Sequence, residues 1–190
     1  SWLIDQVLTL SWRFLAPMEM AQNNSALVAV GGYGRHELHL RSDIDLLILF
    51  RSIPASIEQT FVETLVRFLC YIGLEVCHSV RSLGDCVVQA HADVTVMTNL
   101  LECRHVVGNF ALTETLITRL GTNEIWPIDK FFRAKHEEQW IRHQRYNDTA
   151  FNLEPHLKEG PGGLRDIQTI FWISQRHFGV FHYQQLIEHD

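Results

Sequence analysis

Hydrophobic and polar positions follow two different patterns along this chain, and the change comes near residue 82. Before it, short apolar runs bounded by turn residues predict strands, whereas after it apolar residues recur at helical spacing. The predicted strands are residues 26–30, 43–50 and 74–81. The predicted helices are residues 2–20, a short helix after Gly32, 57–71, most of 83–107, 111–120, 129–145 and 164–178.

Strands that cluster before the helices predict an α+β (mixed) fold, in which a small mixed β-sheet with flanking helices is followed by a helical subdomain. The corresponding domain prediction is an N-terminal helix at 1–25, a core at 26–121 and the helical subdomain at 122–190.

Two aspartates lie two residues apart at the start of the second predicted strand. Side chains alternate between faces along a strand, so Asp43 and Asp45 point to one side, while Ile44 and Leu46 point into a core. Neighbouring carboxylates repel each other unless a cation lies between them. All-oxygen ligands favour magnesium, so the pair predicts a divalent-metal site. The structural alternative is a pair that is simply hydrated.

A glycine-rich turn precedes this strand. Gly31 and Gly32 open the turn, and Gly32 and Gly34 would let the backbone approach a triphosphate closely. The first amides of a helix beginning here would face phosphate oxygens. Ser42, directly before the first aspartate, is predicted to bond a terminal phosphate. Arg35 has two open interpretations, a phosphate ligand or an ion pair with a nearby acid.

Composition limits the partners. Of the 190 residues 46% are hydrophobic and 20% are charged, which is typical of a soluble globular protein. The net charge of −6 argues against a dedicated nucleic-acid binder. No apolar run reaches membrane length. The four cysteines show no C-x-x-C spacing and lie in apolar segments, which predicts reduced thiols and a cytoplasmic protein.

These motifs resemble a known family. Two glycines, a spacer and Ser-Asp-Ile-Asp are similar to the signature of the polymerase-β-type nucleotidyltransferase superfamily. The similarity covers about residues 27–179, and it resembles the bacterial PII uridylyltransferase/uridylyl-removing enzymes most specifically after residue 150. The matching stretches are 30–35, 37–38, 42–47, 73–76, 78–81, 152–155, 158–168 and 176–179.

The resemblance implies transfer of UMP from UTP to a tyrosine of the PII nitrogen-regulatory protein, with release of pyrophosphate. It implies two Mg²⁺ ions held by Asp43 and Asp45, and a third carboxylate on a neighbouring strand. Glu75 is placed for that role by the predicted strand, and Asp93 is the alternative. Cys77 stands where related enzymes sometimes carry the acid. In full-length members of the family a hydrolase domain and ACT domains follow.

Two questions stay open at this level. Arg165 is predicted either to close over the nucleotide or to form a surface ion pair. The chain is predicted to be an enzyme, with a non-catalytic nucleotide-binding module and a nucleotidyltransferase for another base or acceptor as alternatives. For His143, which shares a helix face with His136, the sequence indicates no acid partner.

Overall fold

The structure is a computed structural model, and it describes all residues except 18–23, 39–41, 122–124, 151–153, 155 and 180–190. The chain divides into two compact units, Ser1–Leu120 and Gly121–Asp190, which are described separately. The first contains α1 (Trp2–Leu15), β1 (Ser25–Ala29), α3 (Gly31–Gly34), β2 (Ile44–Phe50), α4 (Ser56–Tyr71), β3 (Val76–Ser82), α5 (Leu83–Ala92), α6 (Val94–Leu101), β4 (Arg104–Gly108) and α7 (Phe110–Leu120). The second contains α8 (Ile128–Gln144) and α9 (Leu164–Phe178).

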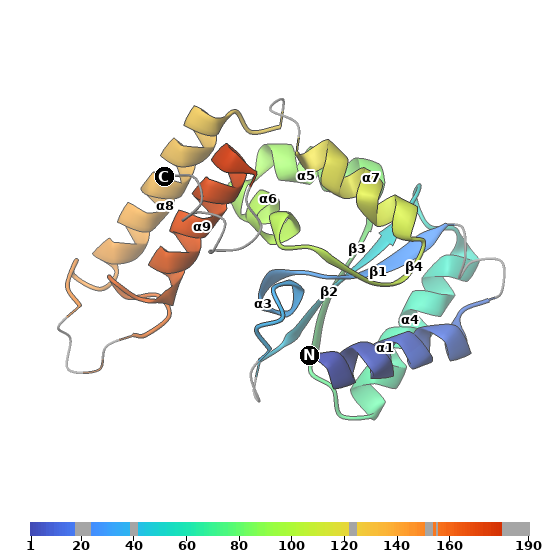
Figure 1. The fold of residues 1–190 in the computed structure, drawn as a ribbon. Helices are drawn as coiled ribbons and strands as arrows, with labels where there is room; N and C mark the ends of the chain where they lie inside the picture. The colour runs from blue at the N-terminus through green and yellow to red at the C-terminus, as the bar shows by residue number, and fades with distance from the viewer. Residues whose placement is uncertain (18–23, 39–41, 122–124, 151–153, 155, 180–190) are drawn as a thin grey trace. The chain divides into compact units, whose positions relative to one another are not determined.

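The first unit is built around one mixed sheet with the strand order β3-β2-β1-β4. β1 is antiparallel to both of its neighbours, whereas β2 and β3 are parallel. Helices α1 and α4 cover one face of the sheet, and α5, α6 and α7 lie on the other (Figure 1). The predicted α+β fold with a small mixed sheet is therefore confirmed.

The alternation along β2 sends its side chains into two layers. Ile44 and Leu46 are 4% and 2% exposed and pack in a cluster with Leu8 and Trp12 of α1, as the sequence predicts. Asp45 alternates with them and therefore lies on the opposite face. The strand thus buries its apolar side chains and presents one carboxylate near its beginning.

The prediction of helix over most of 83–107 is wrong at its end, because Arg104–Gly108 form strand β4. This strand pairs with β1 and makes β1 an interior strand of the sheet. At its end Gly108 has a φ of +98°, and a Cβ there would lie 2.5 Å from the Ser25 carbonyl oxygen. Because β4 lies after α6, the strands do not all precede residue 82. Pairing with a distant strand, which periodicity does not report, decides the conformation here.

Asp166 joins α8, α9 and the loop between them in the second unit. Its carboxylate is 15% exposed and accepts hydrogen bonds from α8 and from the loop. The donors are Gln139 Nε2 at 2.9 Å, Arg142 Nη2 at 2.6 Å, His143 Nε2 at 3.0 Å and the Gly162 amide at 2.7 Å. His143 thus has an acid partner that the sequence did not indicate, since Asp166 follows it by 23 residues.

Within the described ranges, no helix is long and apolar enough to cross a membrane.

Candidate active site

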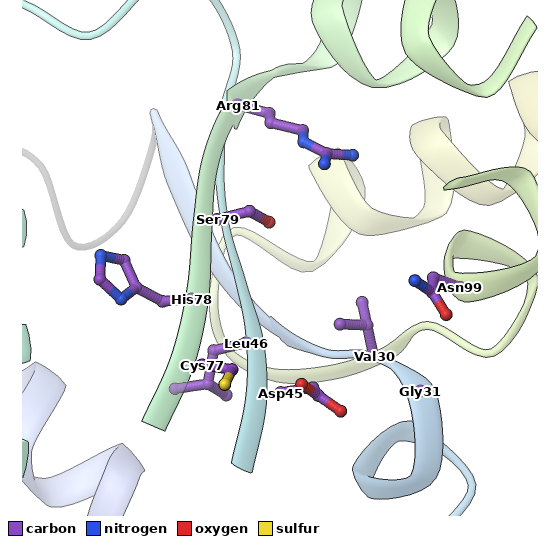
Figure 2. Close-up of a pocket in the computed structure, with 9 residues that line it drawn as sticks. All are labelled: Val30, Gly31, Asp45, Leu46, Cys77, His78, Ser79, Arg81 and Asn99. Carbon is purple, nitrogen blue, oxygen red and sulfur yellow. The ribbon is translucent and has the colours of Figure 1, made fainter. Parts of the chain in front are cut away.

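A pocket of about 240 Å³ opens in the first unit beside the beginning of β2. Polar side chains from β2, β3 and α6 meet there with the glycine turn (Figure 2). The lining consists of Val30, Gly31, Asp45, Leu46, Cys77, His78, Ser79, Arg81 and Asn99. Of the residues predicted from the sequence, Gly31 and Asp45 are in this lining.

Gly31 lies directly against the carboxylate of Asp45. A Cβ on Gly31 would stand 3.1 Å from Asp45 Oδ2, and the residue has a φ of +56°, which favours glycine. The amide of Val30 donates to the Asp45 carbonyl oxygen at 3.1 Å, which fixes the turn to the strand. The glycine therefore brings the first turn of α3 next to the predicted metal ligand.

Cys77 is the residue opposite Asp45 on the parallel strand β3. The pKa of its thiol is raised, first by partial desolvation and then by the charges of Asp43 and Asp45 and a hydrogen bond with Asp43. Both carboxylates therefore act on one thiol, as expected of side chains on the same face. Asp43 itself is exposed and directly precedes β2.

Four polar residues of the pocket lining were missed by sequence reasoning as site residues, namely His78, Ser79, Arg81 and Asn99. Arg81 and Ser79 follow Cys77 at alternate positions of β3, so the two-residue period of the strand places all three on one face. That period was the signal that could have found them. Asn99 comes from α6, and no local sequence pattern places a helix residue beside these strands.

Arg35 and Gly34, both candidates for the nucleotide in the sequence, have close partners within the protein. Arg35 forms an ion pair with Glu37 at 2.8 Å and another with Glu102, whose side chain is 2% exposed. The ion pair that one of the two interpretations of Arg35 expects is therefore present. A Cβ on Gly34 would stand 2.0 Å from the Glu102 carbonyl oxygen, so tight packing requires a glycine at this position.

The remaining predicted residues lie at several places. Glu75 is exposed just before β3, and its carbonyl oxygen accepts the amide of Ile44 at 2.9 Å. Asp93 caps α6 by accepting the Thr95 amide at 2.7 Å, which gives this acid a structural role. Ser42 is half-buried ahead of β2.

Gly32 has space around it, because the atoms nearest to an added Cβ would be 3.6 and 3.8 Å away. Unlike Gly34, it therefore has no packing requirement that explains a glycine.

Arg165 belongs to the second unit and is engaged there. It forms an ion pair with Glu159 at 3.4 Å, donates to Gln168 Oε1 at 3.1 Å and lies 5.4 Å from the ring centroid of Trp172. The surface ion pair that the sequence left open is therefore present.

The donor set at the pocket fits magnesium. Among the described residues, no three His, Cys, Asp or Glu side chains converge to hold a metal ion. Mg²⁺ is usually held by one or two carboxylates together with water and substrate phosphates, so Asp43 and Asp45 meet its requirement from the protein. The pocket beside Asp45 offers room for the phosphates.

Comparison with known proteins gives two family matches. Residues 2–83 match the putative nucleotidyltransferase family DUF294, and residues 130–190 match the family described as GlnD PII-uridylyltransferase. A solved structure described as a toxin–antitoxin with AMP-PNP covers 76% of this chain and 96% of its own, with 14% identity and a TM-score of 0.38. A structural likeness at that level supports no conclusion about this chain.

Several similar curated proteins carry one name, bifunctional uridylyltransferase/uridylyl-removing enzyme. Those from Ectopseudomonas mendocina and Azotobacter vinelandii are each 46% identical over 98% of this chain, and one from Pseudomonas fluorescens is 48% identical over 98%. The chain spans 20–21% of their length. The resemblance predicted from the motifs is thereby confirmed: over the segment that it covers, this chain is a homologue of the bifunctional uridylyltransferase/uridylyl-removing enzymes.

Proposed function

We propose that this chain carries the nucleotidyltransferase site that moves UMP from UTP to a tyrosine hydroxyl of a PII protein. The names of its homologues and of its family matches support this reaction. The structural observation that carries it is the carboxylate of Asp45, held against Gly31 at the wall of a pocket of about 240 Å³. The four cysteines are free thiols, which agrees with the proposed cytoplasmic location.

The reaction requires positioning and charge rather than a covalent intermediate. The tyrosine oxygen forms a bond to the α-phosphorus as the bond from that phosphorus to the pyrophosphate oxygen breaks, and the hydroxyl proton leaves to solvent. Bound Mg²⁺ would stabilise the phosphate oxygens as a Lewis acid. Asp43 and Asp45 would hold the metal, and Gly31 lets the backbone approach the triphosphate.

The other assignments are proposals of the same kind. Ser42 and Gly32 would contact the phosphates, and Glu75 would complete the carboxylates from the strand beside β2. Arg165 would contact the nucleotide only by leaving its partners in the second unit.

A labelling assay tests the reaction. The chain is incubated with Mg²⁺, UTP labelled at the α-phosphate and PII, and both labelled PII and released pyrophosphate are measured. A PII variant in which phenylalanine replaces the acceptor tyrosine is the substrate control, and Asp45→Asn is the enzyme control. Label that reaches PII and is lost with either control supports the proposal. Better labelling from another triphosphate would overturn the choice of base, and pyrophosphate release without labelled PII would overturn the acceptor.

One observation favours a second candidate, a nucleotide-binding regulatory module without turnover. The residue paired with Asp45 on the neighbouring strand is Cys77, where an acid would complete a carboxylate set. Tight UTP binding without release of pyrophosphate, in the presence of PII and Mg²⁺, would establish this module and overturn the transferase.

A further inference from the structure

We propose that Arg81 binds the phosphates of the nucleotide and is the cation that the pocket supplies to balance them. This rests on the proposed function, because it assigns a residue to the triphosphate of the same site. It adds a source of positive charge, since the sequence offered Arg35 and Arg165 as candidates for the nucleotide and the structure brings Arg81, near the end of β3, to the pocket.

The position of Arg81 directs it into the pocket. It lies four residues after Cys77 on β3, and Cys77 pairs with Asp45, so the backbones of Arg81 and Asp45 are separated by about 13 Å along the sheet. The Arg81 side chain leaves β3 on the same side as Ser79, which is the side of the strand on which Asn99 lies (Figure 2). The lining thus has an anionic end at Asp45 and a cationic end at Arg81.

Pairing separates Arg81 from the other arginines near this site. In the part of the chain that the structure describes, the guanidinium of Arg81 makes no ion pair and no hydrogen bond, although the residue is half-buried. Arg35 pairs with Glu37 and Glu102, and Arg104 pairs with Asp5 at 3.0 Å. A partly desolvated guanidinium without an anion is costly, and a phosphate would satisfy it.

Asp85, the acid nearest to Arg81 in sequence, bonds Ser82 and not Arg81. The carboxylate of Asp85 accepts the Ser82 hydroxyl at 2.7 Å and the Ser82 amide at 3.1 Å, as part of the capping box at the start of α5. The pKa of Asp85 is lowered first by these hydrogen bonds and least by the charge of Arg81.

Charge balance favours phosphate over the uracil base as the group that Arg81 contacts. A nucleoside triphosphate remains anionic when it binds one Mg²⁺, and Asp43 and Asp45 add negative charge beside it. A guanidinium can bond two phosphate oxygens at once. A neutral base would leave its charge uncompensated. Asn99, whose amide both donates and accepts, is the better candidate for the uncharged part of the nucleotide.

Calorimetric binding of UTP, ATP, UMP and pyrophosphate, each with Mg²⁺, tests the assignment on the wild-type chain, Arg81→Gln and Arg81→Lys. We expect Arg81→Gln to weaken UTP and pyrophosphate by about tenfold to a hundredfold, to leave UMP nearly unchanged and to lower ATP and UTP affinity equally. Arg81→Lys should recover part of the loss. The matched control is Arg67→Gln, which removes the same charge from an exposed position on α4.

Two results would overturn the assignment while leaving the proposed function intact. One is unchanged UTP and pyrophosphate affinity in folded Arg81→Gln, and the other is a loss confined to UTP among the triphosphates, which would make Arg81 a contact of the base. If the wild-type chain binds neither UTP nor pyrophosphate, the proposed function fails together with this inference. Circular dichroism of each variant verifies the fold, and Arg81→Lys keeps the test valid if Arg81→Gln does not fold.

Discussion

Two arginines, one in each unit, make opposite use of a guanidinium. Arg142 in the second unit bonds Asp166 at 2.6 Å and the Glu159 carbonyl oxygen at 3.0 Å, and its side chain is 7% exposed. Arg81 in the first unit faces a pocket and, among the described residues, its guanidinium has no bonded partner. Sequence motifs cover both, since one contains Arg81 and another contains Asp166. A polar cluster whose members bond one another stabilises the fold, whereas one directed into a cavity is available to a ligand.

The first cluster is the pocket that holds Asp45 and Arg81, and the second is the set of residues bonded to Asp166. The largest difference between the two clusters is expected for the activity and stability of Asp45→Asn. The change keeps the shape of the side chain and removes a charge that would hold Mg²⁺, so PII labelling should fall at least about a thousandfold. The melting temperature should stay close to that of the wild type, because Asp45 lies at the half-exposed start of β2. Initial labelling rates and thermal unfolding measure the two effects.

Asp166→Asn is the matched change in the other cluster, and it should destabilise the second unit. If Asp45→Asn retained near-normal transfer, or if it lowered stability as much as Asp166→Asn, the distinction between the two clusters would fail.

The fold followed from the sequence wherever one local pattern determined an element. The apolar period placed α4, β2 and α9 within a residue or so of their observed bounds. It failed at β4, because Val106 and Val107 read equally well as part of a helix and only the pairing with β1 decides their conformation.

The site residues also divide into those that a local motif predicts and those that only the tertiary structure brings together. Gly31 and Asp45 are close in sequence and in space, and the motif that joins them led to both. Arg81 and Asn99 reach the pocket from β3 and α6, so only the tertiary structure brings them to Asp45. The partners of Arg35 include Glu102, which lies 67 residues away and which no spacing rule would select.

The next largest effect tests whether the glycines of the turn serve packing or the ligand. Gly34→Ala would place a methyl group 2.0 Å from the Glu102 carbonyl oxygen, so we expect a loss of about 3 kcal/mol in unfolding free energy. Gly32→Ala meets only ordinary contacts at 3.6 and 3.8 Å, so its stability should change by less than about 1 kcal/mol.

UTP binding gives a second test of Gly32. Gly32→Ala should weaken UTP binding while it keeps the fold, because the added methyl group stands where the backbone would meet phosphates. Urea unfolding and calorimetry measure both quantities. Normal UTP affinity in Gly32→Ala would remove Gly32 from the proposed site.

A third effect is a loss of about 2 kcal/mol of stability at acid pH in the second unit, where Asp166 bonds residues of α8 and the loop. Burial raises the pKa of Asp166, but hydrogen bonds from Gln139, Arg142, Gly162 and His143 outweigh it and lower the pKa from 3.8 to about 2. A carboxylate whose pKa is depressed on folding contributes stability above its unfolded pKa. That contribution is lost as the pH falls from about 4 toward 2.

Hydrogen exchange of α9 amides between pH 4.5 and 2 measures this local stability, after correction for the intrinsic pH dependence of exchange. Wild-type protection should decline across the window by the stated amount, and Asp166→Asn should begin lower and decline less. Equal slopes for the two proteins would show that another group carries the acid sensitivity.

The smallest effect is the sharpest test of the pocket, because it changes a satisfied polar residue directly beside Arg81. The Ser82 hydroxyl accepts the Asp85 amide at 3.1 Å at the start of α5, so Ser82→Ala should cost about 1 kcal/mol of stability. UTP and pyrophosphate affinity should stay unchanged, because the capping hydroxyl is bonded within the protein and is not part of the pocket lining. Calorimetry compares the variant with Arg81→Gln. If Ser82→Ala weakened UTP as much as Arg81→Gln, the loss in both would come from a displaced end of β3 rather than from a contact between Arg81 and phosphate.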